Sequence, residues 1–336
     1  MNLNKYKNET LLTFLKREGI GDKHTYQDWF KKDKVKINQT PVAENYLIQN
    51  NDELSLRGKK YQIYQSGETG RLAIKSADDE IENIAGKVRV QCGYHKCLTV
   101  YSKRISRKAS FVANPFSRQF RHFFHRLDEF YFDCNQHTIS SVSGHCLDLN
   151  RFEDIKVVHM IRDPRDLLVS GYFYHKRAAE DWCEYLNSTN NDWKIVNASV
   201  PNVLPSDTSY SNYLNQVSTE DGLFSEFEFR RFHYESMLKW PVDDKRVLTV
   251  RYEDVLGNEP EVIRKIYDFY GFPFHVKQAA VFFAGRYSSK SKFRKSSHIR
   301  NSQHGQWKEI FSNQLNEKFV ERYGDLLDKY DYPRKL

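Results

Sequence analysis

The sequence has few cysteines and no long apolar stretch. Its five cysteines are an odd number spread over 336 residues, and no two have the spacing of metal ligands. This usage favours reduced thiols over a disulfide framework or a metal site. The apolar runs are all shorter than the roughly 18 residues that a membrane helix needs, and no secretory signal pattern occurs. We therefore expect a cytoplasmic protein with no membrane span.

Acidic residues are outnumbered by basic ones. The formal net charge is +8 and the isoelectric point is near 9.0, which favours anionic ligands without separating a nucleotide from RNA or a membrane surface. Hydrophobic residues make up 39% of the chain, enough for one large domain with a small additional module.

A buried strand is predicted over residues 155–161, because this run is apolar and rich in β-branched residues. Asp163-Pro164 ends the strand and starts a helix that carries Ser170, eight residues after Arg162. Ligands of open α/β sheets bind at such a strand end, and an arginine fork with a hydroxyl suits phosphate. The alternative is a surface ion pair between Arg162 and Asp163 or Asp166.

A second strand, residues 88–92, runs into a tight turn at Gly93 and then a helix that starts near Thr99. Lys96 lies in the turn. A lysine beside the free N–H groups of a helix start is typical of an anion site. The usual nucleotide-triphosphate loop is excluded, because Gly-Lys-Ser/Thr is missing and Cys97-Leu98 follows the lysine.

These two stretches resemble the signatures of sulfotransferases that use 3′-phosphoadenosine 5′-phosphosulfate (PAPS). "HKCLTVY" is similar to the family's 5′-phosphosulfate loop, and Arg162 to Ser170 matches its 3′-phosphate motif. "VRYEDVLGNEPEVIRKIYDFYGFP" and "IRNSQHGQWKEIF" resemble two later motifs, so the resemblance extends from about residue 85 to the C-terminus. It implies an α/β protein with a central, mostly parallel sheet flanked by helices, the P-loop-like sulfotransferase fold.

The resemblance also implies an activity and a site. The sulfuryl group of PAPS would pass to an acceptor hydroxyl of a glycan, a lipid or a small metabolite, leaving 3′,5′-adenosine bisphosphate; no metal is required. Lys96 would be catalytic. The cofactor would be bound by His95, Lys96, Cys97, Leu98, Thr99, Val100, Tyr101, Arg162, Ser170, Tyr252, Arg300, Asn301 and Ser302.

Four positions depart from the family pattern. Leu98 replaces a glycine, which is acceptable only if its φ is negative, and Val100 replaces a threonine hydroxyl. Asn301 and Ser302 replace Lys-Gly and remove a cation. We therefore expect a modest affinity for the cofactor.

His145 is the candidate general base, because many relatives carry a catalytic histidine shortly before the arginine strand and residues 139–143 are predicted as a strand. Some glycan-type relatives use a glutamate instead, which keeps Glu129 and Asp128 as reserve candidates.

Residues 1–62 read as a small α+β module, residues 63–84 as a linker or edge hairpin, and residues 85–336 as the sulfotransferase domain. The module resembles the small RNA-binding domain of pseudouridine synthases, although its lysines also fit a solvated face. One alternative is therefore an RNA-binding protein with an inactive sulfotransferase-like domain. A nucleoside kinase-like phosphotransferase is a further rival, disfavoured by the missing Gly-Lys-Ser/Thr.

Three longer segments complete the prediction. A helix in the stretch 118–132 would place Phe120, Phe123, Phe124 and Leu127 on one face. Residues 178–220, polar and long, fit a lid or acceptor-binding insertion. Residues 221–240 read as one helix rich in phenylalanine.

Overall fold

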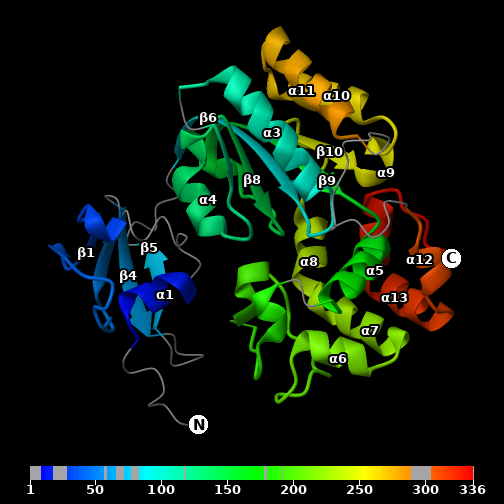
Figure 1. The fold of residues 1–336 in the computed structure, drawn as a ribbon, viewed down its shortest axis with the longest axis horizontal. Helices are drawn as coiled ribbons and strands as arrows, with labels where there is room; N and C mark the ends of the chain where they lie inside the picture. Colours follow the sequence, from blue (N-terminus) through cyan, green and yellow to red (C-terminus); the bar gives the residue numbers. More distant parts are fainter. Residues whose placement is uncertain are drawn as a thin grey trace. The chain divides into compact units, whose positions relative to one another are not determined.

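The structure is a computed structural model that describes residues 9–17, 29–56, 59–65, 72–76, 83–116, 119–177, 180–190, 192–288 and 304–335. The chain divides into two compact units, Met1–Ile84 and Ala85–Leu336 (Figure 1). Each unit has its own hydrophobic core and is described by itself below.

The N-terminal unit is an antiparallel sheet with the strand order β2-β1-β3-β4-β5. The strands are β1 (Val35–Ile37), β2 (Thr40–Pro41), β3 (Glu53–Leu56), β4 (Lys59–Gln65) and β5 (Leu72–Ser76), preceded by α1 (Leu11–Arg17). Leu11, Phe14 and Leu15 of α1 are buried in a core shared with Val35 and Ile37. Residues 63–84, expected as a linker or edge hairpin, therefore contribute the end of β4 and the edge strand β5 to this sheet.

The larger unit is built on a five-stranded sheet with the order β10-β9-β6-β8-β7. Its strands are β6 (Ile84–Gly93), β7 (Phe120–His122), β8 (Ile139–Ser143), β9 (Phe152–Ile161) and β10 (Val247–Arg251). The pairs β10–β9, β6–β8 and β7–β8 are parallel. The predicted central parallel sheet is thus confirmed. It is buried because helices cover it, as the continuous apolar run of β9 requires.

Helices lie on both sides of this sheet (Figure 1). One group holds α3 (Thr99–Ala113), α10 (Glu259–Tyr270) and α11 (Phe274–Arg286), which pack on one another. The other group packs around α5 (Pro164–His175) and α8 (Arg231–Lys239); it includes α6 (Tyr210–Gln216), α7 (Thr219–Phe229), α12 (Trp307–Ile310) and α13 (Asn313–Lys329). The short helices α4 (Leu127–Asp133) and α9 (Tyr252–Val255) complete the unit. No helix within the described parts of the chain is both long and apolar enough to cross a membrane.

Two of the helix predictions are wrong. Residues 120–122 form the edge strand β7 beside β8, so Phe123 is buried while its neighbour Phe124 is exposed. Residues 221–240 form the end of α7 and then α8, separated at Arg230, whose φ of −84° and ψ of 4° leave the helical region. The physical cause in both places is a contact with a distant part of the chain, which local patterns do not record.

The polar segment after α5 is structured rather than an open loop. Two short 3-10 helices, Asp181–Glu184 and Asp192–Val196, place Trp182 and Trp193 against Tyr210 and Phe229. These aromatic rings are buried and belong to the main core. Its predicted role as a lid or acceptor-binding insertion stays a prediction.

Candidate functional site

The site lies where two neighbouring strands send the chain in opposite directions. β6 and β9 are adjacent in the sheet; the chain leaves β6 through α3 toward β8 and leaves β9 through α5 toward β10. Such a switch point opens a crevice outside the carboxyl ends of the strands, where ligands of α/β sheets bind. The turn that carries Lys96 follows β6, and Arg162 follows β9.

The turn after β6 has an unusual backbone. Lys96 and Leu98 have φ values of 74° and 52°, both in the left-handed region. The condition under which a leucine would be acceptable here, a negative φ, is therefore not met, and a β-carbon in this conformation costs roughly 1–3 kcal/mol. The side chain of Leu98 packs against the main core, which offsets part of this cost. The turn closes through a hydrogen bond from Cys97 N to Tyr94 O of 3.0 Å.

The helix after this turn begins without a side-chain cap. The Thr99 hydroxyl donates to Tyr94 O at 3.4 Å, and Val100 is exposed. Tyr101 donates its hydroxyl to Ala284 O of α11 at 3.2 Å, which fixes the ring between the two helices. The N–H groups of this first turn therefore face the crevice without a competing cap from the chain's own side chain.

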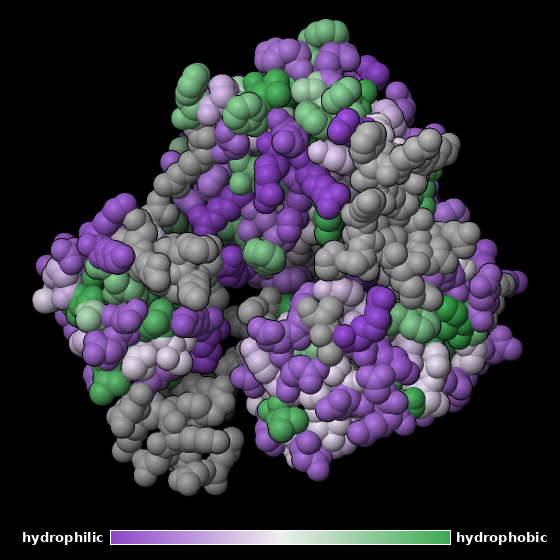
Figure 2. Space-filling model, in the orientation of Figure 1, coloured by the Kyte–Doolittle hydropathy of each residue, from purple (hydrophilic) through white to green (hydrophobic). Residues whose placement is uncertain are grey.

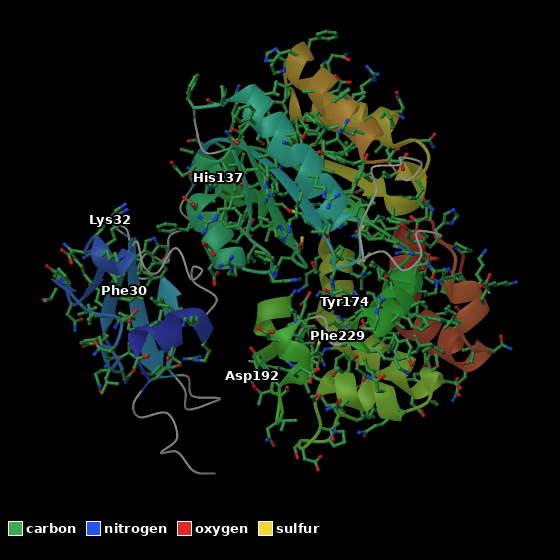
Figure 3. All side chains as sticks on the ribbon, in the orientation of Figure 1. Phe30, Lys32, His137, Tyr174, Asp192 and Phe229 are labelled. Atoms are coloured by element: carbon green, nitrogen blue, oxygen red, sulfur yellow. The ribbon has the colours of Figure 1, made fainter. Side chains whose placement is uncertain are left out.

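Lys96 is partly buried and has other cations near it. Its Nζ lies 4.3 Å from the centroid of the Tyr174 ring, which projects from α5 (Figure 3). The pKa of Lys96 is lowered to about 8, first by burial and then by neighbouring cations, against a smaller opposing effect of Glu180. Those cations, in order of effect, are Arg177, Arg230 and Arg162. Positive charge therefore gathers around Lys96, while Arg162 and Arg230 each have a carboxylate partner, Asp166 and Glu226.

Arg162 forms one of the two ion pairs considered for it, with Asp166, but the pair is buried rather than on the surface. Its guanidinium lies 4.4 Å from the Tyr252 ring centroid and 3.5 Å from the Asp166 carboxylate. Ser170, at the predicted spacing, is half-buried two turns along α5. Arg162 thus follows the carboxyl end of β9 and Ser170 lies two turns into the next helix, as the sequence predicts.

Asp166 connects this strand end to the C-terminal part of the chain. Its carboxylate accepts hydrogen bonds from Gly305 N at 2.6 Å and from Trp307 N at 3.1 Å. The Trp307 ring lies under the Arg165 guanidinium at 3.4 Å. Arg300, Asn301 and Ser302 lie outside the described residues, but the residues that follow them are anchored beside Arg162.

His145 follows β8 at the same edge of the sheet. Gly93 pairs with Ser143, and Gly144 N donates to Gly93 O at 2.8 Å, so the turns after β6 and β8 adjoin. The His145 Nε2 donates to the His125 carbonyl at 2.7 Å, which orients the imidazole. His137, in contrast, precedes β8 and contacts Asp133, at the opposite end of the strand (Figure 3).

The reserve bases are placed differently. Glu129 is buried on α4 and forms ion pairs with Arg121 and Arg126. Asp128 is exposed. A carboxylate whose oxygens face two guanidinium groups is a weak proton acceptor, because protonation would remove both attractions.

His95 and Cys97 line the crevice in uncharged forms. The His95 ring lies 4.7 Å from the Tyr174 ring, and burial, then His175, hold the pKa of His95 well below its usual value. Burial raises the pKa of the Cys97 thiol. Neither side chain adds negative charge, so the site stays electropositive at neutral pH.

Sequence reasoning missed a buried polar network beneath α5. Glu226 accepts hydrogen bonds from Tyr210 Oη at 3.0 Å and contacts His175 Nδ1 at 2.8 Å, while Arg230 Nε lies 2.9 Å from its other oxygen. All four side chains are fully buried. Because they come from three helices, no spacing in the sequence marks them. The network matters to the site because Arg230 is one of the cations that lower the pKa of Lys96.

Within the part of the chain that the structure describes, no group of three or more His, Cys, Asp or Glu side chains could hold a metal ion.

Comparisons with known proteins find sulfotransferases. A family model described as a sulfotransferase domain matches residues 145–331. A zebrafish (Danio rerio) protein, "Sulfotransferase 6B1", is 25% identical over 179 residues, which are 50% of this chain and 50% of that protein. The match thus spans about half the length of this curated relative. Nothing in the comparisons supports the resemblance of residues 1–60 to an RNA-binding module.

Two solved structures are similar at low identity. Mouse sulfotransferase SULT7A1 complexed with PAP, which is 3′,5′-adenosine bisphosphate, is 14% identical with a TM-score of 0.40. The match covers 80% of this chain and 96% of that chain. Retinol dehydratase in a complex with retinol and PAP is 13% identical with a TM-score of 0.43, over 91% and 96%.

Proposed function

Because the chain belongs to the sulfotransferase domain family, which its residues 145–331 match, we propose that it transfers the sulfuryl group of PAPS to an acceptor hydroxyl. The product would be 3′,5′-adenosine bisphosphate, the form in which the cofactor occurs in the two similar structures. The acceptor would be a glycan, a lipid or a small metabolite, and the reaction would take place in the cytoplasm.

The observation that carries this proposal is the gathering of cations at the switch point. Burial lowers the pKa of Lys96 first, and Arg177, Arg230 and Arg162 then lower it further, so the three arginines lie close enough to act on the lysine. A donor with phosphate groups at two positions and a sulfuryl group needs several cations in one crevice. The cations of this chain therefore suit PAPS, which carries several negative charges, better than a singly charged ligand.

Two groups of residues would hold the donor. Arg162 and Ser170, with Arg300 from beyond the described residues, would bind the 3′-phosphate. The N–H groups from Cys97 to Thr99 and the Thr99 hydroxyl would bind the 5′-phosphate. Val100 supplies no hydroxyl there, and Asn301 and Ser302 supply no cation, which supports a modest affinity.

Two tyrosines would contact the adenine. Tyr101 is fixed between α3 and α11 by its bond to Ala284 O. Tyr252 presents one face to Arg162, so it links the adenine contact to the 3′-phosphate contact. The turn residues would contribute mainly backbone groups and the shape of the cofactor site; these residues are His95, Cys97 and Leu98.

The reaction would be a direct in-line displacement. The acceptor oxygen forms a bond to sulfur while the bond from sulfur to the bridging phosphate oxygen breaks, and the electron pair stays on that oxygen. Lys96 would stabilise the charge that develops there, and its position beside the strand end costs no rearrangement during the step. No protein group needs to bond to sulfur.

His145 would accept the proton of the acceptor hydroxyl. Since its Nε2 is a donor to the His125 carbonyl, the basic atom of the neutral ring is Nδ1. Glu129 is disfavoured by its two arginine partners, and Asp128 by its exposure. We expect His145→Ala to lower kcat by about 10²–10⁴-fold and Glu129→Gln to act mainly on stability.

Calorimetry with two nucleotides tests the proposal. 3′,5′-adenosine bisphosphate should bind about 10–150-fold more tightly than 5′-AMP, because a charge-assisted contact to the 3′-phosphate contributes about 1.5–3 kcal/mol. Ser170→Ala should weaken the bisphosphate and leave 5′-AMP unchanged. Equal affinities in the unchanged protein would reject the assignment, and salt-dependent RNA binding without nucleotide uptake would favour the RNA-binding alternative.

A screen for release of the bisphosphate from PAPS would then find the acceptor. Hydroxyl compounds of the three classes are compared with matched compounds that lack the hydroxyl. Turnover with one class identifies the acceptor; binding of the bisphosphate with no turnover for any class would mean a domain that binds the nucleotide but is inactive.

A further inference from the structure

A large part of the surface around α3 has no acidic residue. Residues 83–127 contain no Asp or Glu, and neither do residues 269–308. The fold brings these two acid-free stretches together, because α3 from the first packs against α11 from the second. The charged side chains of α3 and α11 are therefore all basic.

On α3 the exposed residues share one face. Val100, Arg104, Arg107, Lys108, Phe111 and Val112 follow one another at spacings of three, four or one, which places them on a single side of a helix. The opposite side, with Ile105 and Ala109, is buried. The exposed fraction is 55% for Phe111 and 99% for Phe116, just after the helix. Aromatic side chains of this size rarely stay in water without a function.

The outer side of α11 continues this face. Lys108 Nζ lies 5.9 Å from the Phe283 ring centroid, and the Arg104 guanidinium lies 5.9 Å from the Tyr287 ring. Phe282, next to Phe283, is 63% exposed. Figure 2 shows apolar and polar residues interleaved over α3 and α11 at the top of the view. We call the exposed residues of α3, Phe116 and Phe282 the basic–apolar face.

We propose that the basic–apolar face docks on an anionic lipid membrane, with the phenylalanines entering the headgroup region and the arginines and lysines pairing with lipid phosphates. The argument is charge complementarity combined with protruding apolar groups. A soluble polyanion would use the cations but would leave Phe111, Phe116 and Phe282 in water. A membrane interface uses both, as interfacial amphipathic helices do.

Vesicle co-sedimentation with the full-length protein tests this proposal without reference to catalysis. The protein should sediment with vesicles of phosphatidylcholine mixed with phosphatidylserine, and not with phosphatidylcholine alone, and salt should release it. Arg107→Glu with Lys108→Glu should weaken binding at least about 25-fold, since each cation near an anionic surface contributes a factor of roughly five. Phe111→Ser with Phe116→Ser should weaken it about tenfold or more.

Matched control variants separate this face from general charge and apolarity. Lys239→Glu with Lys245→Glu makes the same change in net charge at two exposed lysines outside the face. Leu186→Ser with Val203→Ser removes exposed apolar groups from the segment after α5. Both controls should bind vesicles like the unchanged protein, and circular dichroism checks that every variant is folded.

Three results would overturn the proposal. Equal binding to both kinds of vesicle would refute the role of charge. If the control variants lost as much vesicle binding as the face variants, the basic–apolar face would not be the docking surface. Binding to a single-stranded RNA or a sulfated polysaccharide, lost with Arg107→Glu and Lys108→Glu while vesicles are not bound, would assign the face to a soluble polyanion.

Discussion

Gly171 offers the sharpest test of the buried network beneath the site. It lies inside α5, next to Ser170, and an added β-carbon would come within 2.1 Å of both Arg230 Nη2 and Glu226 Oε1. Both of these side chains are fully buried, so neither can swing into solvent to make room. We therefore predict that Gly171→Ala destabilises the protein, although alanine is the better helix former.

The expected magnitude follows from three opposing effects. Helix propensity would favour alanine by about 1 kcal/mol. Overpacking a closed interior costs about 1–3 kcal/mol, and separating a buried ion pair costs up to about 3–5 kcal/mol. Even with partial relaxation of the helix, the losses exceed the gain, and we expect a net loss of roughly 2 kcal/mol or more.

Denaturant unfolding measures this loss of stability. Tryptophan fluorescence is a suitable probe, because the ring centroids of Trp182 and His175, a residue of the network, are 5.1 Å apart. Gly285→Ala on α11 is the matched control: there the added carbon meets only Pro260 Cγ, at 3.9 Å. That variant should gain up to about 1 kcal/mol. If Gly171→Ala also gained stability, the close packing of Arg230 and Glu226 against α5 would be refuted.

Three further predictions concern the crevice. Leu98→Gly should be more stable than Leu98→Ala by about 1 kcal/mol in denaturant unfolding, because only glycine relieves the positive φ; the reverse order would contradict the left-handed turn. The kcat/KM should fall as the pH rises through about 8, where Lys96 loses its charge, and Lys96→Arg should move that limb to higher pH; an unchanged limb would assign it to another group. Asp166→Ala should speed hydrogen exchange at the Gly305 and Trp307 amides, which it anchors, while exchange in the N-terminal sheet serves as the internal control.

Much of the core architecture could be predicted from local signals. The end of β9 at Ile161 follows from a run of apolar residues, and the strand Ile139–Ser143 from the β-branched residues in and before it. Helix α10 begins after Asn258 and ends at Gly271, whose φ of 76° is the left-handed stop that the glycine predicts. In each case the residues that decide the structure are close together in the sequence.

The errors arise where distant contacts decide. An aromatic run that suits a helix becomes β7 because β8 offers a strand edge to pair with, at residues 139–141. The helix predicted over residues 221–240 breaks at Arg230, whose buried side chain packs against α5 beside Gly171. A propensity argument contains neither partner, so it cannot place the break.

The same limit applies to the candidate site. Lys96 and Arg162 stand in motifs, and the motif spacing is enough to place both at the carboxyl ends of neighbouring strands. The backbone of Leu98 is not predictable in this way, because a leucine at φ 52° is tolerated only when surrounding packing holds it. The turn therefore carries a leucine in a conformation that a β-carbon disfavours.

The cations of the crevice explain why such strain can be retained. Burial and, after it, the nearby Arg177, Arg230 and Arg162 lower the pKa of Lys96, so the charge of the lysine is held there at a cost in free energy. Like charges held together cost stability until an anion lies between them, and an anionic ligand that binds only the folded state returns that cost as binding energy. The PAPS proposed here would meet cations that are already in place, since Asp166 lies beside Arg162 and Glu226 holds Arg230.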